Sequence, residues 1–504
     1  MSGSPPDASR AHASTPGADD PAAHDPEPLV ARGVGLLREA GLTEGDRLVV
    51  LLPNRPHTFG VLAAACLEGV VPVPLPTDLG AGELAEIVLD ADPRAIVADL
   101  SSAARARELG VEVQVLDEER VARQTPAEPS SSWPRTRPMA YTSGTTGRRK
   151  GVYAGVHDAA WGQQTTQDEH TAFDRRHGQL HLVVSPLYHS APFRFAQVTA
   201  LTGGRVAILP GFTPDGLLTA LRTLRPTSMF CVPTHLHRLL AHGEVGPDDL
   251  ASLQLLAHAG APCPTPLKER LLELAPEDAV WEFYGSTEGQ FTVCPPQVWR
   301  AAPGTVGHAR PGRELSVRDD DGRPLPPGEV GTVWARVPDH AVFEYWRDPQ
   351  RTAEAWDGDA FTVGDLGSLD EAGRLTLAGR PGDLVITGGV NVYPAEVERR
   401  LLDAPGVAEA VVFGVDDDDW GQRVEAAVVA WPDATVDPEQ LRAVLTQELA
   451  RAKVPKRIHV VADLPRTSTG KIRRDGTLQE AVVESASRST AGPSPSAPGR
   501  ERRT

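Results

Sequence analysis

The sequence predicts an α/β protein with a large N-terminal domain of parallel-rich sheets and helices and a smaller α+β C-terminal domain. Two observations lead to this prediction. Short apolar runs alternate with helical patterns along the chain, which is typical of βαβ units and parallel sheets. The chain has 504 residues, and because a domain usually contains roughly 100–200 residues, more than one domain is expected.

The N-terminal elements follow from local patterns. Apolar residues recur at helical spacing over 27–40, and Gly41 ends this helix. The apolar run 46–52 predicts a buried strand that Pro53 stops. The same reasoning predicts further helices at 59–67, 81–90 and 214–224, and strands at 70–73, 95–98, 206–209 and 228–232.

Composition and charge exclude several classes of protein. Apolar residues make up 40% of the chain, which is enough for large cores, and the net charge of −18 disfavours a nucleic-acid or anionic-membrane surface. The four cysteines are scattered without a Cys-x-x-Cys motif, so neither a zinc site nor a disulfide framework is indicated. Without a ~20-residue apolar run or a signal-peptide core, we expect a cytoplasmic enzyme, either monomeric or homodimeric.

The stretch 141–151, YTSGTTGRRKG, combines small hydroxyl side chains, glycines and cations. Glycine allows the backbone to approach a ligand and to expose its amide groups. The side chains and glycines that could then hold a polyphosphate are Thr142, Ser143, Gly144, Thr145, Thr146, Gly147 and Lys150. A polar linker would have a similar composition. The stretch is not a Walker A loop, because Gly-Lys-Ser/Thr opening a helix is absent.

Lysine is scarce in this chain, and arginine supplies most of the cations. The five lysines are Lys150, Lys268, Lys453, Lys456 and Lys471. Two of them, Lys150 and Lys471, fall within glycine- and hydroxyl-rich loops. Both are therefore candidates for a specific role.

The loop at 141–151 resembles, nearly residue for residue, the phosphate loop of the acyl-adenylate-forming superfamily. That superfamily contains the acyl-CoA synthetases, the peptide-synthetase adenylation domains and firefly luciferase. The chain differs at Arg149, where the family usually has proline. The resemblance implies that ATP is bound here and that the loop residues cradle the outgoing pyrophosphate.

A second motif, EFYGSTEG at 282–289, follows in the order found in the family. Alone it would be an ordinary turn. The resemblance implies that Tyr284 stacks on the adenine, Thr287 contacts a phosphate and Glu288 binds Mg²⁺, which prefers hard oxygen ligands. It also places Gly260 and Ala261, in the small-residue loop HAGAP at 258–262, beside the adenine and the acyl group.

Two further motifs complete the resemblance. Asp365 could accept bonds from the two ribose hydroxyls, with Arg380 as its partner, although Gly-Asp is also common at a hairpin corner. Lys471, in LPRTSTGKI at 464–472, corresponds to the family's catalytic lysine, although a surface lysine is the alternative. A long ammonium side chain can reach the charge that develops between carboxylate and phosphate.

The domain boundary is expected directly after Arg380. We expect a disordered leader at 1–26, an ATP- and acyl-binding domain at 27–380, a C-terminal domain at 381–483 and a disordered tail at 484–504. Strand-like and helical runs alternate in the C-terminal part at 395–402, 407–415, 424–431, 438–448 and 458–461. The resemblance implies that this domain is mobile and turns about Gly382, where the family usually has aspartate or lysine.

The acid pocket is the least specified part of the site. By resemblance, His189 lies beside the acyl pocket and the thiol tunnel and is a candidate for substrate gating, although a lone histidine is more often a structural hydrogen bonder. The run after it, SAPFR at 190–194, has no aspartate to hold an ammonium group, so an α-amino acid is disfavoured. Arg194 could pair with an anionic substrate tail, but a structural salt bridge is the favoured interpretation. The pocket candidates are His189, Phe193, Arg194, Thr234, His258 and Gly285.

These motifs predict an ATP- and Mg²⁺-dependent enzyme that adenylates a carboxylic acid and, by family analogy, transfers the acyl group to a thiol. CoA is the expected acceptor. Three alternatives stay open at this point: transfer to an acyl carrier protein, an amine acceptor or another oxyacid, and a nucleotide-binding regulatory protein without turnover. The sequence does not name the acid.

Overall fold

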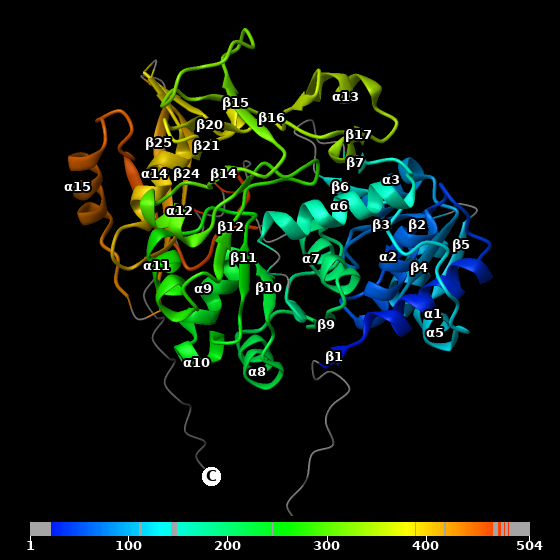
Figure 1. Ribbon diagram of the computed structural model, residues 1–504. Helices are drawn as coiled ribbons and strands as arrows, with labels where there is room; N and C mark the ends of the chain where they lie inside the picture. The colour runs from blue at the N-terminus through cyan, green and yellow to red at the C-terminus, as the bar shows by residue number, and fades with distance from the viewer. Residues whose placement is uncertain are drawn as a thin grey trace, which may run out of the picture.

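The structure is a computed structural model, and it describes most of the chain (Figure 1). The described residues are 22–466 without 110–112, 143–148, 175, 177, 244, 389, 418–419 and 433, together with 472–474, 478 and 482. The architecture is α/β, as predicted, with several sheets and helices packed around them. Within the described residues, no helix is long and apolar enough to cross a membrane.

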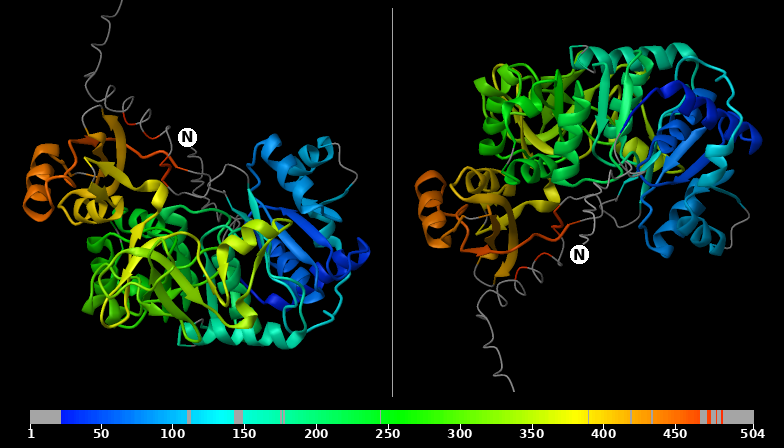
Figure 2. Two further views of the ribbon diagram at one scale, coloured as in Figure 1. Left: turned by 90° about the horizontal axis from the view of Figure 1, so that it is seen from above. Right: turned by 90° about the horizontal axis from the view of Figure 1, so that it is seen from below.

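The first sheet is parallel and has the strand order β3-β2-β4-β5. Its strands are β2 (Arg47–Leu51), β3 (Val71–Pro74), β4 (Ala95–Ala98) and β5 (Gln114–Asp117). Its helices are α1 (Pro26–Glu39), α2 (Pro56–Glu68), α3 (Ala81–Ala91), α4 (Leu100–Glu108) and α5 (Glu118–Arg123). This layer lies at one end of the molecule in two further views (Figure 2).

The second sheet has the order β1-β9-β8-β10-β11-β12 and is parallel except for β1. Its strands are β1 (Ala23–His24), β8 (Leu180–Val183), β9 (Arg205–Ile208), β10 (Ser228–Cys231), β11 (Leu255–His258) and β12 (Val280–Glu282). Its helices are α6 (Ala159–Ala172), α7 (Ser190–Leu201), α8 (Pro214–Leu224), α9 (Pro233–Ala241), α10 (Pro247–Leu250), α11 (Thr265–Leu274) and α12 (Pro296–Ala301). One hydrophobic core joins α1 and α2 to β8, β9 and α7.

Antiparallel strands lie above these two layers in Figure 1. One sheet contains β15 (Glu314–Arg318), β16 (Gly331–Arg336), β18 (Trp356–Asp357), β19 (Ala360–Phe361), β20 (Leu366–Leu369) and β21 (Leu375–Gly379). A three-stranded sheet joins β6 (Ala140–Thr142), β7 (Lys150–Tyr153) and β17 (Glu344–Tyr345). The remaining elements here are β13 (Thr292–Val293), β14 (His308–Ala309), a 3-10 helix at Asp339–Ala341 and α13 (Pro349–Ala355).

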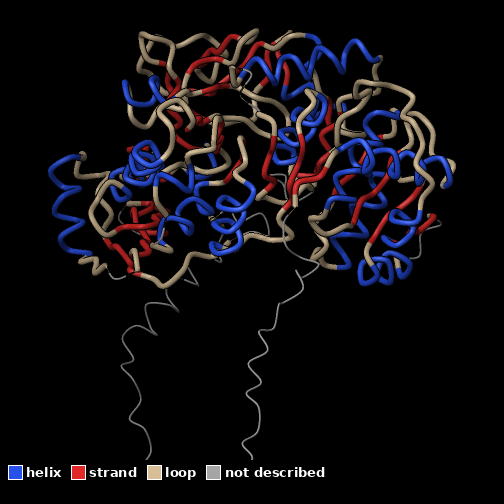
Figure 3. The backbone as a smooth tube through the Cα atoms, turned by 60° about the horizontal axis from the view of Figure 1, so that its bottom comes forward, coloured by secondary structure: helices blue, strands red, loops and turns tan. Residues whose placement is uncertain are grey.

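The C-terminal part has a core of its own. Its sheet contains β22 (Val385–Thr387), β23 (Val390–Val392), β24 (Val407–Asp417), β25 (Gly421–Ala430) and β26 (Arg457–Val460). A 3-10 helix at Pro381–Asp383 precedes it, and α14 (Pro394–Leu402) and α15 (Pro438–Glu448) pack with the strands. In Figure 2 this α+β unit, coloured yellow-orange to red, lies at one side of the larger part, and Figure 3 shows the helices and strands along the whole described backbone. The α+β unit meets the larger part where the ring of His237 lies 4.0 Å, centroid to centroid, from Trp431.

The expected secondary structure agrees closely with the observed elements, with one difference at the N-terminus. Ala23 and His24 form β1 and pair with β9, so ordered structure begins inside the leader expected at 1–26. Residues 1–21 and the expected tail at 484–504 lie outside the described part of the chain. The boundary after Arg380 stays a prediction.

Candidate active site

The register of one antiparallel pair brings Asp365 and Arg380 together. Asp365 directly precedes β20 and Arg380 directly follows β21, and Leu366 pairs with Gly379 between these strands. Gly364 and Gly379, each just before one of the two, have φ of +80° and +120°, which glycine adopts without strain. As a result, Arg380 Nε donates a hydrogen bond of 2.7 Å to Asp365 Oδ1.

Tyr284 completes this group from the end of the parallel sheet. It follows β12 by two positions, and its hydroxyl donates a hydrogen bond of 2.6 Å to Asp365 Oδ2. Its ring is buried and stacks on Phe291 at 4.7 Å between centroids. Burial, and then the negative charge of Asp365, raise the pKa of Tyr284 well above its usual value. The hydroxyl therefore stays protonated, and each carboxylate oxygen retains a lone pair for a further donor.

A second group forms around Glu288. Lys150 Nζ lies 3.0 Å from Glu288 Oε1 and donates a hydrogen bond of 2.7 Å to the Tyr345 hydroxyl. The Tyr345 hydroxyl in turn donates a hydrogen bond of 2.9 Å to Glu288 Oε1. Burial would raise the pKa of Glu288, but the charge of Lys150 and these hydrogen bonds lower it, so the buried carboxylate is ionised.

The two groups adjoin. The charge of Glu288 contributes to the raised pKa of Tyr284. The positive charge of Arg380 likewise acts on Tyr345, whose pKa is raised by burial and then by Glu288. The site thus places a carboxylate and an arginine at one end and a carboxylate, a lysine and a tyrosine at the other.

The strands β6 and β7 position the two ends of the hydroxyl-rich loop. Thr142 and Lys150 are paired across these antiparallel strands. The Thr142 hydroxyl is buried and has no hydrogen-bond partner among the residues that the structure describes. A buried hydroxyl without a partner is costly, so a ligand oxygen at this position would satisfy it. Five predicted members of the loop lie outside the described residues: Ser143, Gly144, Thr145, Thr146 and Gly147.

Lys471 also lies outside the described residues, but the chain on either side of it is described. Arg466 and Ile472 form an antiparallel bridge. Arg149, the neighbour of Lys150, binds the carboxylate of Glu83 on α3. The hydrogen bond from Arg149 is the main reason why the pKa of Glu83 is lowered, and the charge of Arg473 adds to it. Arg473, two positions from Lys471, is thus close enough to Glu83 for its charge to act on that carboxylate.

The remaining residues predicted to line the nucleotide and acid sites lie in loops and at helix ends. His189 immediately precedes α7, its ring 4.4 Å from that of Tyr188, and Thr234 is half-buried in the first turn of α9. Gly260 and Ala261 are exposed after β11. Thr287 is half-buried in the turn that Gly285 and Gln290 close with a β-bridge.

Three predicted pocket residues have structural partners. Phe193 is 1% exposed and packs in the core against Phe59, so it does not line an open pocket here. His258 is fully buried, with its Nε2 in contact with Lys268 Nζ, which also donates to Glu282. Arg194 Nε lies 3.0 Å from Glu169 Oε1, which is the structural salt bridge favoured above.

Tyr345 was missed by the sequence analysis. It belongs to no local motif, and it reaches Lys150 only because β17 pairs with β7. Arg137, Glu169 and Arg310, which surround Arg194, were missed for the same reason. No signal in the sequence around these residues indicates their position.

Fold and site together define an adenylate-forming ligase, and the comparisons with known proteins agree. Residues 30–346 match the family described as AMP-binding enzyme, and residues 396–471 match its C-terminal domain. The chain belongs to the AMP-binding enzyme family.

Curated relatives cover nearly the whole chain. A feruloyl-CoA synthase from Amycolatopsis sp is 33% identical over 88% of this chain and 90% of its own length. The fatty acid–[acyl-carrier-protein] ligase ScoC from Streptomyces coeruleorubidus is 33% identical over 87% of each chain. These names describe those proteins, and they include two kinds of acceptor.

Solved structures agree with the same class. ATP-bound MatB from Rhodopseudomonas palustris has a TM-score of 0.79 and 31% identity, with 90% of this chain and 92% of that chain covered. The amide bond synthetase McbA from Marinactinospora thermotolerans has a TM-score of 0.79 and 31% identity, with 90% and 93% covered.

Proposed function

We propose that this ligase activates a carboxylic acid with ATP and transfers the acyl group to the thiol of CoA. In the first step a carboxylate oxygen of the acid attacks the α-phosphorus of ATP, and the bond to pyrophosphate breaks. In the second step the CoA thiol, which loses its proton, attacks the acyl carbon and AMP leaves. The observation that carries the proposal is the pair of adjoining groups, Tyr284–Asp365–Arg380 and Lys150–Tyr345–Glu288.

The first group suits the nucleoside of ATP. The aromatic face of Tyr284 would lie against the adenine. Asp365, held by Arg380, would accept hydrogen bonds from the ribose hydroxyls, since its oxygens keep free lone pairs. Both donors that hold Asp365 stay protonated at neutral pH, so the carboxylate is fixed before the nucleotide arrives.

The second group suits the phosphates. Lys150 and Thr142 are paired across β6 and β7, at the two ends of the glycine-rich loop, and the Thr142 hydroxyl has no partner among the described residues. The amide and hydroxyl groups of Ser143, Gly144, Thr145, Thr146 and Gly147 would cradle the leaving pyrophosphate. The hydroxyl of Thr287 would contact the same phosphate chain. Positioning and neutralisation of charge account for most of the work in such a transfer.

The residues at Glu288 fit a magnesium ion. Among the described residues no cluster of three or more His, Cys, Asp or Glu side chains could hold a metal by itself. Mg²⁺ in nucleotide sites is usually held by one or two carboxylates together with phosphates and water. Glu288, with the Thr287 hydroxyl nearby in the chain, offers such an oxygen set. The ion would neutralise phosphate charge, and Lys150 would keep Glu288 ionised.

The acid and the catalytic lysine are assigned by position. His189, Thr234, Gly260, Ala261 and Gly285 lie at the ends of β8, β10, β11 and β12, where ligands bind in open α/β sheets. Lys471 would bridge the acid carboxylate and the α-phosphate. For transfer to CoA, the C-terminal domain (381–483) would turn about Gly382.

A second candidate function differs in the acceptor. ScoC is named for transfer to an acyl carrier protein and McbA for amide bond synthesis. Either acceptor would use the same first step. CoA is preferred because several curated relatives, including the feruloyl-CoA and indoleacetate–CoA ligases, carry CoA in their names.

A panel of aliphatic, aromatic and dicarboxylic acids tests the first step by acid-dependent release of pyrophosphate from ATP. The same acids with CoA, a carrier protein that bears a free phosphopantetheine thiol, or a primary amine then test the acceptor by mass spectrometry of the product. We expect pyrophosphate release with at least one acid and a thioester with CoA. Pyrophosphate release that does not depend on an acid would contradict the proposed function. An amide product would show that the acceptor is an amine and not CoA.

A further inference from the structure

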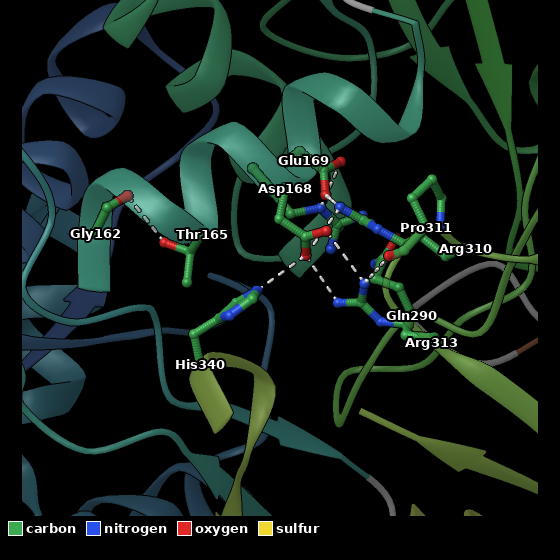
Figure 4. Close-up of polar contacts among 10 residues, drawn as sticks. Gly162, Thr165, Asp168, Glu169, Gln290, Arg310, Pro311, Arg313 and His340 are labelled. Carbon is green, nitrogen blue, oxygen red and sulfur yellow. Dashed lines mark hydrogen bonds and ion pairs between the residues drawn. The ribbon is translucent and has the colours of Figure 1, made fainter. Parts of the chain in front are cut away.

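Arg194 belongs to a buried cluster of four arginines and two carboxylates at the junction of α6, α7 and the chain after β14. We call Arg137, Arg194, Arg310, Arg313, Asp168 and Glu169 the arginine cluster. Figure 4 shows Asp168 and Glu169 on α6, facing Arg310 and Arg313 from the other side. The cluster supplies more guanidinium groups than carboxylates.

Both carboxylates are paired with arginines. Arg313 binds Asp168 with two hydrogen bonds, of 3.2 and 2.9 Å. Arg310 Nη2 lies 2.8 Å from Glu169 Oε2 and 3.6 Å from Asp168 Oδ2. Arg310 also donates a hydrogen bond of 3.0 Å to Gln290 Oε1. Gln290 lies two residues beyond Glu288, so this bond connects the cluster to the phosphate end of the site.

The surplus positive charge is concentrated on Arg137 and Arg194. Their Nη2 atoms are buried and have no hydrogen-bond acceptor in the described part of the chain. Burial, and then the positive charges of Arg194 and Arg313, lower the pKa of Arg137 to about 10, although Glu288 opposes this. Arg194 pairs with Glu169 through its Nε, 3.0 Å from Oε1, but its Nη2 donor, like that of Arg137, has no acceptor among the described residues. A buried donor without an acceptor is costly, so an anion at this position would satisfy it.

Arg194 lies at the acid end of the site. It is five positions after His189, and its guanidinium carbon lies 5.9 Å from the ring centroid of Phe283, the residue before Tyr284. Phe283 belongs to an apolar cluster with Ala259, Ala191 and Val232, from the ends of β11, α7 and β10. The side chain of Arg194 keeps 23% of its surface accessible. It therefore borders an apolar wall, and part of the side chain, though not the Nη2 atom, is accessible.

From this arrangement we propose that the acid substrate carries a second anionic group, a carboxylate, which binds to Arg194 while the first carboxylate is adenylated. This inference rests on the function proposed above and names its substrate class. A guanidinium binds a carboxylate through two parallel hydrogen bonds, and the unpartnered Nη2 atom of Arg194 supplies such a donor. A monoacid of the same length leaves it unsatisfied.

The test compares matched acids: hexanoate with adipate, octanoate with suberate, and cinnamate with 4-carboxycinnamate. Acid-dependent pyrophosphate release is measured for the wild type, Arg194→Leu, Arg194→Lys and the control Arg205→Leu, which changes an exposed arginine at the start of β9. We expect kcat/KM to favour at least one diacid by roughly 10–100-fold, as for hydrogen bonds to a charged group. Arg194→Leu should abolish the preference, Arg194→Lys should restore part of it, and Arg205→Leu should leave it unchanged.

Thermal unfolding supplies a readout that needs no turnover. A bound diacid should raise the Tm of the wild type more than its monoacid, and this difference should vanish in Arg194→Leu. The proposal is overturned if no diacid exceeds its monoacid, or if the preference survives in Arg194→Leu. Pyrophosphate release with monoacids alone would overturn it and leave the adenylation function standing.

Nucleotide binding is the competing use of the cluster. We expect ATP alone to raise the Tm of the wild type and Arg194→Leu equally. If ATP stabilises Arg194→Leu less and no diacid preference is found, the cluster binds phosphate and the proposal is wrong.

Discussion

Tyr345 donates a hydrogen bond of 2.9 Å to Glu288, although the two residues are 57 positions apart in the chain. The same hydroxyl accepts a hydrogen bond from Lys150 Nζ, 2.7 Å away. One phenol thus links the end of the glycine-rich loop to the proposed metal ligand.

Tyr345→Phe should weaken ATP binding without removing the ring. The variant leaves Glu288 and Lys150 in place but removes the hydroxyl between them. Loss of one hydrogen bond costs about 1 kcal/mol of binding free energy, and loss of one to a charged group costs more. We expect KM for ATP to rise by roughly 5–10-fold, measured by pyrophosphate release over a range of Mg²⁺ concentrations. Tyr153→Phe, on the paired strand β7, is the matched control. An unchanged KM would mean that the phenol only fills space.

Asp365→Ala should lose the discrimination between ATP and 2′,3′-dideoxy-ATP. A hydrogen bond to a charged carboxylate contributes about 1.5–3 kcal/mol. The wild type should therefore prefer ATP by about tenfold or more, and the variant should treat both nucleotides alike. Tyr284→Phe keeps the carboxylate and should retain the preference. Equal discrimination in wild type and Asp365→Ala would place the ribose elsewhere.

Lys471→Ala should remove adenylation while the fold remains intact. The loss of one charge-stabilising contact in the transition state is expected to cost on the order of 10²–10³-fold. Acid-dependent exchange of pyrophosphate into ATP measures this step alone. Lys453→Ala, which removes an ammonium that binds Glu396 in the C-terminal domain, is the control. Near-normal exchange in Lys471→Ala would exclude the lysine from the mechanism.

Gly382→Ala should separate the two half-reactions. A Cβ at Gly382 would meet no atom within 4 Å, so the variant fits the arrangement seen here. Alanine narrows the φ range open to a hinge residue. We expect adenylation to change by less than about twofold, on the basis that no contact is lost, and thioester formation to slow. If both steps are unaffected, the domain turns about another residue.

Asp168→Asn should destabilise the protein at neutral pH and flatten its response to acid. Burial would raise the pKa of Asp168, but His340, Arg310 and Arg313 together hold it well below its usual value. A carboxyl group whose pKa is lower in the folded than in the unfolded state stabilises the folded protein at pH values above its unfolded pKa, about 3.9. This stabilisation is lost as the pH falls from there toward the pKa of the folded state. We expect a loss of about 3–5 kcal/mol at pH 7, as for a broken buried pair.

Urea unfolding at pH 7 and at pH 3 measures that effect. The difference between wild type and Asp168→Asn should be large at pH 7 and smaller at pH 3. Asp319→Asn, at an exposed turn, serves as the control. A difference that does not depend on pH would show that packing, not charge, is lost.

Helix α8 shows why many element boundaries could be predicted. Its expected range, 214–224, matches the observed Pro214–Leu224 because the signals are local. Pro214 opens the helix, and the Thr213 hydroxyl accepts a hydrogen bond of 3.0 Å from the Gly216 amide. Helix α15 matches its expected range, 438–448, for the same reason, with Asp437 as its cap.

Phe193 and Arg194 show what the sequence could not predict, namely which side chains of α7 face the site. Both were proposed for the acid pocket because both follow His189. In α7, however, consecutive side chains point about 100° apart around the axis. Phe193 therefore enters the core beside Phe59, while Arg194 turns toward Glu169 and Phe283. Which face of the helix meets the site depends on how α7 packs.

The amino-acid sequence alone determined the α/β class and the order of the elements, because glycine turns, caps and apolar periodicity act over a few positions. It also identified the motif residues, through their resemblance to a known family. Only the tertiary structure decided that Tyr345 bonds to Glu288 and that Arg194 pairs with Glu169. Those contacts depend on strand pairing and helix packing between distant segments. No local pattern encodes them, since the partners meet only when the chain has folded.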